Sequence, residues 1–388
     1  MLLENQPYPQ DPRVRAEAES LAAAGHRVTV YAPRRRGQSR REQIAGVEVR
    51  RYRLPSMGRG IPSLLLEYAI AHVQLIACAA GALRRGADVL HIHNPPDTLF
   101  PAAMLARSSG RAVVFDHHDL FPELVELRTG SVFYVLIARA AQWLAVRTAT
   151  TVIVTNESQR DIVLRRTRIA PERVVIVRNG PARAMLAANG ARRPGVLAEP
   201  AIVFVGELSH QDGVLALPDL LRQPALAGAR LTVVGDGYCR AELAEQIAAD
   251  PALSARVTLA GRVDHALVPA LLAQADLALD PAPNTPLNSA STMIKIAEYM
   301  AAGLPVVAFD LSETRRTAGE GALYARCGDV AEMAELLAAL AADPSMRERV
   351  SELGRNRVQE LLWEQSERSL LDVYDRLPVR VVKTAPLP

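Results

Sequence analysis

The sequence predicts an α/β protein with two domains, each built on a parallel β-sheet. Short apolar runs alternate with helical patterns along almost the whole chain, which is typical of parallel strands connected by helices. The chain has 388 residues, more than one hydrophobic core usually serves. Residues 184–200, rich in Ala, Gly, Arg and Pro, interrupt the alternation and indicate a linker. We therefore expect domains at 1–183 and 184–359, with a C-terminal helix within about 360–388 packing back on the first domain.

The elements follow in a regular order. Asp11 and Pro12 form an N-cap and first-turn pair, and Gly25 ends the first helical pattern. Apolar runs then predict five strands in each domain. These strands are 28–32, 89–93, 112–116, 151–155 and 174–177, followed by 201–205, 231–234, 257–259, 277–279 and 306–309. Open parallel sheets bind ligands beyond the carboxyl ends of their strands, so the residues after each strand are the functional candidates.

Composition narrows the class of protein. Hydrophobic residues make up 49% of the chain, which argues against disorder, and the net charge is only +3. Cys78, Cys239 and Cys327 are odd in number and widely spaced, so they indicate neither a disulfide framework nor a zinc motif. The first residues lack the basic and apolar regions of a secretory signal. We expect a cytoplasmic protein.

Two segments raise the question of a membrane. Residues 64–83 are strongly apolar, but Glu67, His72 and Gln74 interrupt them, which favours a buried or surface-docked helix over a membrane span. Eight arginines within 34–53 precede this helix and fit either a solvated loop or peripheral contact with an anionic leaflet. Nucleic acid is disfavoured, because aromatic residues are only 4% and none alternates with the arginines to stack on bases.

The most informative stretch is 286–310, PLNSASTMIKIAEYMAAGLPVVAFD. Ser291 or Thr292 can cap a helix that ends at Gly303, and the free N–H groups of its first turn would bind an anion. Lys295 is one of only two lysines in the chain, which favours a phosphate contact over an ordinary solvated lysine. Glu298 lies three residues later, and a sugar or ribose hydroxyl is its sensible partner. This combination suggests a nucleotide sugar.

Several motifs in order resemble glycosyltransferase family 4, the retaining glycosyltransferases with the GT-B fold, in the branch with an STMxKxxEYMAxG motif. They are YPQDPRVRAEAESLAAAGHRVTV, HIHNPPD, FDHHDLFPE, VRNGPA, VGDG and STMIKIAEYMAAGLPVVAFD. The resemblance implies two Rossmann-like domains facing a cleft, the first for an acceptor and the second for a nucleoside diphosphate sugar. It implies hexosyltransferase-type transfer to a hydroxyl of a glycan, a lipid-linked acceptor or a small molecule, with retention.

The resemblance also implies roles for particular residues. His118 matches the histidine that contacts the donor sugar, Glu298 the glutamate that binds ribose, and Gly206 the glycine beside the phosphates. Asp97 follows HNPP and either orients or deprotonates the acceptor hydroxyl, or merely caps a helix. The further donor-binding candidates are Arg178, Asn179, Gly235, Asp236, Ser291 and Thr292.

Three departures from the family pattern concern charge. Glu207 and Asp212 stand where relatives carry an arginine and a lysine, and Ala290 stands where they carry an acid. Lys295, a helix N-terminus and either Arg13 or Arg178 must then neutralise the diphosphate, with Lys295 counted as catalytic.

No cofactor or metal is expected. There is no Asp-x-Asp motif, and no carboxylate or thiolate pattern completes the histidines 91, 93, 117 and 118 as a zinc site. The alternatives are a GT-B fold nucleotide-sugar epimerase and a non-catalytic nucleotide-sugar-binding subunit.

Overall fold

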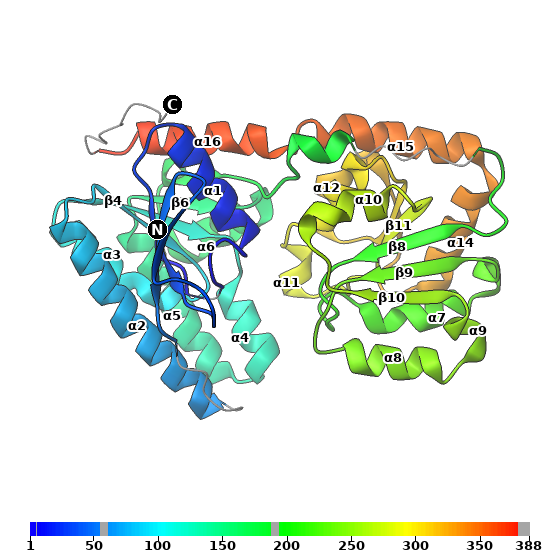
Figure 1. Ribbon diagram of the computed structural model, residues 1–388, viewed down its shortest axis with the longest axis horizontal. Coiled ribbons are helices and arrows are strands. Elements are labelled where there is room, and N and C mark those ends of the chain that lie inside the picture. The colour runs from blue at the N-terminus through cyan, green and yellow to red at the C-terminus, as the bar shows by residue number, and fades with distance from the viewer. Residues whose placement is uncertain (5, 55–60, 188–193, 379–388) are drawn as a thin grey trace. The chain divides into compact units, whose positions relative to one another are not determined.

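The computed structural model describes residues 1–4, 6–54, 61–187 and 194–378, and its chain divides into two compact units (Figure 1). Unit 1 contains Met1–Arg178 and the segment that begins at Ser366, and unit 2 contains Asn179–Gln365. The chain thus enters unit 2 inside the VRNGPA motif and leaves it within the last helix. The central part of the predicted linker, 188–193, lies outside the described residues.

Unit 1 contains two groups of strands. A three-stranded group has the order β1-β3-β2, and a parallel four-stranded group has the order β4-β5-β6-β7. Leu2 joins the groups through isolated parallel bridges to Tyr31 and Ile92. The strands are β1 (Thr29–Pro33), β2 (Arg41–Ile44), β3 (Val47–Tyr52), β4 (Val89–His93), β5 (Ala112–His117), β6 (Thr151–Val154) and β7 (Val174–Ile176).

The hairpin of β2 and β3 was not predicted. It turns at Ala45 and Gly46, which both have positive φ. Of the eight arginines within 34–53, Arg41, Arg50 and Arg51 lie on these strands, so the expectation of a solvated loop was wrong for this part of the segment. Arg51 is buried and pairs with Glu42, while Arg50 pairs with Glu48.

Helices cover the strands of unit 1. Asp11 caps the first of them, accepting from the Val14 N–H at 3.0 Å, as expected. The last helix packs on unit 1 where the Tyr374 hydroxyl lies 2.9 Å from His91 Nδ1. The helices are α1 (Pro12–Ala23), α2 (Ile61–Arg84), α3 (Phe100–Ser108), α4 (Phe121–Thr129), α5 (Val132–Thr148), α6 (Glu157–Thr167) and α16 (Trp363–Asp375).

Helix α2 contains the segment with membrane-like composition. Within the described residues, Leu66–Arg84 is the one helical segment long and apolar enough to cross a membrane. Ala71, Leu75 and Ala79 on this helix are buried in the core of unit 1. This buried stripe makes α2 a helix of the domain.

Unit 2 is built on a six-stranded parallel sheet with the order β10-β9-β8-β11-β12-β13. Ile202 and Phe204 belong to one hydrophobic cluster, and the intervening Val203 belongs to another. Both faces of the sheet are therefore buried, which explains the continuous apolar runs of its strands. The strands are β8 (Ala201–Val205), β9 (Arg230–Val234), β10 (Val257–Gly261), β11 (Leu277–Asp280), β12 (Val306–Phe309) and β13 (Ala322–Ala325).

Nine α-helices of unit 2 connect or cover these strands in its described residues. They are α7 (Leu217–Leu221), α8 (Arg240–Ala248), α9 (Pro251–Ser254), α10 (Val268–Leu272), α11 (Pro286–Ser289), α12 (Ile294–Ala301), α13 (Ser312–Ala318), α14 (Val330–Ala342) and α15 (Pro344–Val358). The loops that follow β8, β9 and β11 at their carboxyl ends are the ones that carry the predicted donor-binding residues or their partners.

Candidate active site

His118 is fixed at the carboxyl end of β5. Its backbone N–H donates to Asn94 Oδ1 at 2.9 Å, and its Nδ1 lies 2.9 Å from Asp116 Oδ2. Asn94 itself follows β4, the neighbouring strand, and also accepts the N–H of Asp119 at 3.0 Å. Asn94 was missed by sequence reasoning, although its place directly after a strand was the signal that could have found it.

Asp116 is the centre of a buried network in unit 1. Arg13 donates to both of its carboxylate oxygens, from Nε at 2.8 Å and from Nη2 at 2.7 Å, and His93 Nδ1 lies 3.0 Å away. Arg13 also donates to the Val177 carbonyl at 3.0 Å. We call Arg13, His93, Asn94, Asp116 and His118 the His118 network. The suggestion that Arg13 neutralises the donor diphosphate was wrong, since its guanidinium is buried and committed to this network.

The charges of this network are set by one another. Burial opposes ionisation of Asp116, but Arg13 and His118 hold the pKa of its carboxyl well below the ordinary value. Burial would likewise lower the pKa of His118, but Asp116 raises it to about 9. His118 is therefore a doubly protonated imidazolium at neutral pH.

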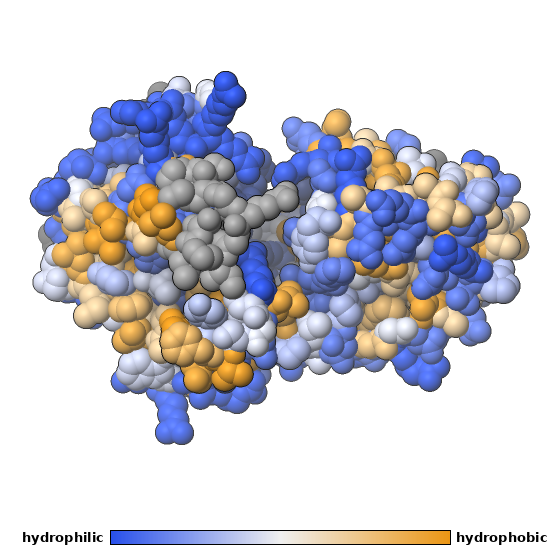
Figure 2. All heavy atoms as spheres, turned by 90° about the horizontal axis from the view of Figure 1, so that it is seen from below, coloured by the Kyte–Doolittle hydropathy of each residue, from blue (hydrophilic) through white to orange (hydrophobic). Residues whose placement is uncertain are grey.

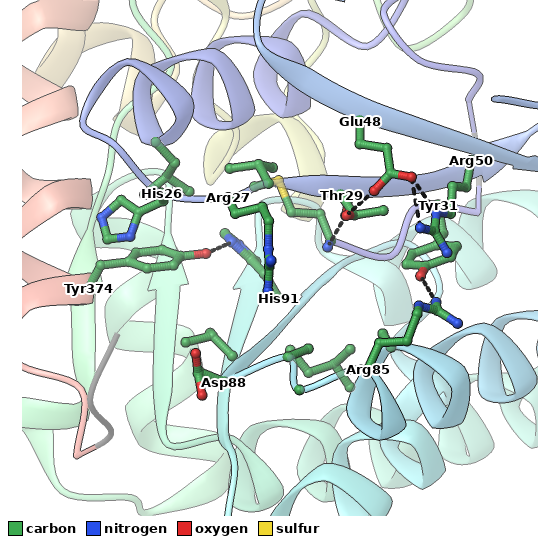
Figure 3. A pocket seen from close by; sticks show the side chains of 18 residues that line it. His26, Arg27, Thr29, Tyr31, Glu48, Arg50, Arg85, Asp88, His91 and Tyr374 are labelled. Carbon is green, nitrogen blue, oxygen red and sulfur yellow. Dashed lines mark hydrogen bonds and ion pairs between the residues drawn. The ribbon is translucent and has the colours of Figure 1, made fainter. Parts of the chain in front are cut away.

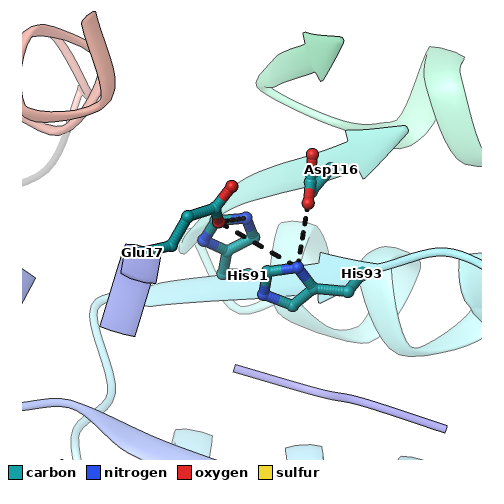
Figure 4. Close-up of side chains that lie close together, drawn as sticks. All are labelled: Glu17, His91, His93 and Asp116. Atoms are coloured by element: carbon teal, nitrogen blue, oxygen red, sulfur yellow. Dashed lines mark hydrogen bonds and ion pairs between the residues drawn. The ribbon is translucent and has the colours of Figure 1, made fainter. Parts of the chain in front are cut away.

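Two acids complete a cluster with two histidines on β4. The ligand atoms of Glu17, His91, His93 and Asp116 all lie within 4.8 Å of one another (Figure 4). The expectation that no carboxylate completes this histidine pair was therefore wrong, because α1 brings Glu17 over the strand. A cation there would meet the buried guanidinium of Arg13, which lies 3.1 Å from Glu17. We interpret the cluster as part of the protein's own hydrogen-bonded network.

Asp97 lies beside the His118 network. It is buried, its Oδ1 accepts from Asn94 Nδ2 at 2.8 Å, and burial raises its pKa to about 7. The short 3₁₀ helix that begins at Asp97 has Pro96 at its N-cap position and no side-chain cap. Helix α3, which follows, has none either. The capping alternative for Asp97 was therefore wrong, and its role toward an acceptor stays a prediction.

In unit 2, two glycines allow the ends of β8 and β9 to approach closely. Gly235 has φ +145°, and a Cβ on it would lie 1.8 Å from the Gly206 carbonyl oxygen. A Cβ on Gly206 would lie 2.9 Å from Lys295 Nζ. Asp236 is exposed, and its Oδ1 accepts the Gly237 N–H at 2.9 Å.

Lys295 lies beneath these glycines among acidic groups. Its Nζ donates to Asp212 Oδ1 at 2.6 Å, lies 3.5 Å from Asp280 Oδ1, and sits 4.6 Å from the centre of the Phe204 ring. Burial would lower the pKa of this ammonium, but Asp280 and Asp212 raise it. Lys295, Asp212 and Asp280 form what we call the Lys295 cluster. The interpretation as an ordinary solvated lysine was wrong, since only 6% of Lys295 is exposed.

The start of helix α12 differs from the prediction. It begins at Ile294 with Met293 at the N-cap position and no side-chain cap, so capping by Ser291 or Thr292 was wrong. The physical reason is the preceding short helix α11, because Ser291 Oγ donates back to the Leu287 carbonyl at 2.7 Å.

The remaining candidates divide between the two units. Glu298 lies one turn after Lys295 on α12 and is buried, with its Oε1 2.8 Å from His265 Nε2. Arg178 forms an ion pair with Glu157 in unit 1. Asn179 is the first residue of unit 2. Unit 2 thus brings Gly206, Gly235, Lys295 and Glu298 to one region, and unit 1 does the same for Asp97 and His118.

A cavity of about 710 Å³ in unit 1 lies elsewhere (Figure 3). Asp88, Thr29 and His91 line it, so it opens at the amino ends of β1 and β4. Tyr374 points into the same region toward His91. The cavity contains none of the predicted site residues.

Comparison with known proteins identifies the family. Residues 10–180 match the family model "Glycosyl transferase 4-like domain", and residues 199–343 match "Glycosyl transferases group 1". The chain is 26% identical to an alpha-D-kanosaminyltransferase of Streptomyces kanamyceticus, over 56% of this chain and 57% of the relative. It is 27% identical to an alpha-maltose-1-phosphate synthase of Mycobacterium tuberculosis, over 60% of this chain and 65% of the relative. These matches span less than two thirds of either relative.

Solved structures share the fold over nearly the full length. The sucrose-phosphate synthase of Thermosynechococcus elongatus superposes with a TM-score of 0.76 and 20% identity, covering 96% of this chain and 94% of that one. Anabaena HepE in complex with UDP-glucose gives 0.71 and 17%, covering 97% and 99%. The chain therefore belongs to the group 1 glycosyltransferases of family 4, retaining enzymes with the GT-B fold that use nucleotide-sugar donors.

Proposed function

We propose that this protein transfers a sugar from a nucleoside diphosphate sugar to an acceptor hydroxyl, with retention at the anomeric carbon. The observation that carries the proposal is His118 at the carboxyl end of β5, with its Nδ1 2.9 Å from Asp116 Oδ2. Asp116 occupies its Nδ1, so Nε2 is the atom that donates to the ligand. An imidazolium held by a buried carboxylate supplies a hydrogen bond to the donor sugar that needs no rearrangement during the reaction.

Unit 2 supplies the groups that suit the nucleotide. Gly206 and Gly235 lie together at the ends of β8 and β9, where a side chain on Gly206 would meet Lys295 and one on Gly235 would meet the Gly206 carbonyl. Lys295 lies next to this backbone, and Glu298 offers carboxylate oxygens to the ribose hydroxyls. The relative HepE was solved with UDP-glucose, which supports a UDP-linked hexose as the first donor to test.

The reaction breaks the bond between the anomeric carbon and the diphosphate oxygen, and forms a bond from that carbon to the acceptor oxygen. Negative charge then develops on the diphosphate. Lys295 is the cation proposed to stabilise it. The acceptor hydroxyl loses its proton in the same process, and Asp97, whose pKa of about 7 suits proton exchange, is its proposed partner.

The test is sugar transfer from UDP-, GDP- and ADP-sugars to a panel of hydroxyl acceptors. His118→Ala should lower kcat by about a hundredfold or more, while donor binding in a thermal-shift assay is retained. The matched control is His72→Ala, since His72 lies on α2 and bonds to Tyr68 and Thr98 outside the His118 network.

Normal turnover in His118→Ala would reject the proposed role. Donor conversion without an acceptor would favour the epimerase, and binding without any turnover would favour the non-catalytic subunit. Metal independence stays a prediction, which the same assay tests when EDTA is added.

A further inference from the structure

Helix α5 presents its larger apolar side chains to solvent. Val132, Phe133, Leu136 and Ile137 are 75%, 67%, 57% and 47% exposed, and Trp143 is 44% exposed. Half of the six buried residues of the same helix are alanines: Ala138, Ala141 and Ala145, together with Val135, Gln142 and Val146. We call Val132, Phe133, Leu136, Ile137, Ala140 and Trp143 the outer face of α5.

This face belongs to a wider apolar surface on unit 1. Leu127 on α4 is 55% exposed and lies just before the Gly130 turn into α5, while Met104 on the adjacent α3 is 53% exposed. Of the twelve large hydrophobic residues exposed within the described part of the chain, nine lie in unit 1 and five of these on α5. Figure 2 shows hydrophobic side chains gathered on the side of unit 1 where Figure 1 draws α2, α4 and α5. Contiguous surfaces of this kind mark sites of interaction.

The charged residues around the outer face of α5 indicate which kind of partner it binds. Arg139 and Arg147 are exposed on the same helix, and Arg128 is exposed at the end of α4. The sequence from 127 to 156 contains no aspartate or glutamate. A second copy of the chain would bring the arginines of α5 against one another, and the nearest acidic residues in the sequence are Glu126 and Glu157. These residues therefore match a partner that has negative charges at its surface and an apolar layer below them.

We propose that the outer face of α5 docks on the surface of an anionic lipid bilayer. Phe133, Leu136 and Ile137 enter the boundary of the acyl region, and the arginines contact lipid phosphates. Arg147 lies 4.8 Å from the centre of the Trp143 ring, an arrangement suited to the headgroup level, where both side chains have an apolar body and a polar end. This surface differs from the arginine-rich segment that the sequence suggested, whose Arg50 and Arg51 are paired with glutamates.

Trp143 provides a direct reporter of docking. The chain contains two tryptophans, so Trp363→Phe leaves Trp143 alone. Its fluorescence should shift to the blue when vesicles of phosphatidylcholine and phosphatidylglycerol are added, and the protein should sediment with them. Pure phosphatidylcholine vesicles should bind more weakly, and added salt should weaken binding to the anionic vesicles.

Matched variants test whether vesicle binding depends on the outer face of α5 or on exposed hydrophobic residues in general. Val132→Gln should reduce sedimentation, whereas Val196→Gln should not, because Val196 is a similarly exposed valine of unit 2, at 69%. Phe133→Gln with Leu136→Gln should abolish binding. Arg139→Gln should lower the affinity for anionic vesicles about fivefold, the effect of one basic residue near such a surface.

Three results would overturn the proposal: no binding to anionic vesicles, equal binding by the Phe133 and Leu136 double variant, or a fluorescence shift that is the same with neutral lipid. Sedimentation equilibrium tests the alternative that a second copy of the chain covers the outer face of α5. A dimer that the double variant converts to a monomer would assign the face to a second copy instead.

Discussion

The two units surround their buried charges in opposite ways. In the His118 network, a carboxylate, Asp116, is surrounded by donors from Arg13, His93 and His118. In the Lys295 cluster, a single ammonium lies between two carboxylates. The histidine is therefore charged by its surroundings before any ligand arrives, whereas the charge of the lysine is already compensated. The presence of Lys295 in its motif therefore does not by itself make that site positively charged.

The largest expected effect comes from removing the carboxylate at the centre of the His118 network. Asp116→Asn leaves the buried guanidinium of Arg13 without its bidentate partner, and breaking a buried pair in this way costs about 3–5 kcal/mol. The variant should also lower the pKa of His118 from about 9, since Asp116 is the group that raises it. Urea unfolding and the NMR titration of the His118 ring measure the two effects.

Asp88→Asn is the matched control, because Asp88 pairs with Arg111 at 3.0 Å while both side chains are about one third exposed. Its free energy of unfolding should change by about 1 kcal/mol or less. If the two variants lost similar stability, the Asp116 network would be no stronger than a surface ion pair.

An intermediate effect is expected from pH. The pKa of Glu17 is raised from 4.5 to about 8, by burial first and then by Asp116, and that of His118 is raised from 6.5 to about 9. The stability from each raised pKa is complete below the unfolded value and is lost as pH rises through the folded value. Between pH 7 and 8 both groups weaken unit 1 as pH rises, each by up to about 1.4 kcal/mol per pH unit.

Glu17→Gln removes one of these contributions and should make the fall of stability with pH shallower in that window. Unfolding of unit 1 can be followed through Trp143 in the Trp363→Phe background. An unchanged slope in Glu17→Gln would show that Glu17 is ionised in the folded protein at pH 7.

Much of the fold followed from the sequence because parallel strands buried on both faces are continuous apolar runs, as in β8, β11 and β12. The hairpin of β2 and β3 did not, since its arginines interrupt the apolar pattern of a strand and its turn has no Asn-Gly signal. Positions after strands pointed to His118 and Gly206, which lie at the carboxyl ends of β5 and β8, and their roles stay predictions. The contact between Asp116 and Arg13 could not be inferred, because these two residues are 103 residues apart in the sequence.

The start of α12 illustrates a second limit. Ser291 and Thr292 are good capping residues, but the chain directly before them forms the four-residue helix α11, which Thr285 caps. Local propensity could not choose between the two starts. The choice depends on the buried Asn288, whose side chain donates to the Gln211 and Pro283 carbonyls at 2.8 and 2.9 Å.

The smallest expected effect is on the affinity for UDP, and it tests whether the charge of Lys295 is compensated by its carboxylate neighbours. The family resemblance implies a lysine at position 212, but Asp212 stands there and accepts a hydrogen bond from Lys295 Nζ at 2.6 Å. A diphosphate that approaches Lys295 must displace or tolerate this carboxylate. Asp212→Asn should therefore raise the affinity for UDP about tenfold by removing one like charge from a partly buried site, while Lys295→Ala should lower it. Isothermal titration calorimetry with UDP measures both changes.

The control for overall charge is Asp219→Asn, because Asp219 is 67% exposed and pairs with Arg222 on the surface of the same unit. It should leave the affinity for UDP unchanged, whereas a gain equal to that of Asp212→Asn would attribute the effect to net charge alone. A lower affinity in Asp212→Asn would reverse the interpretation of the cluster. Asp212 would then be a group that binds the nucleotide sugar itself, through a hydroxyl, and Lys295 would serve to hold Asp212 in place for that contact.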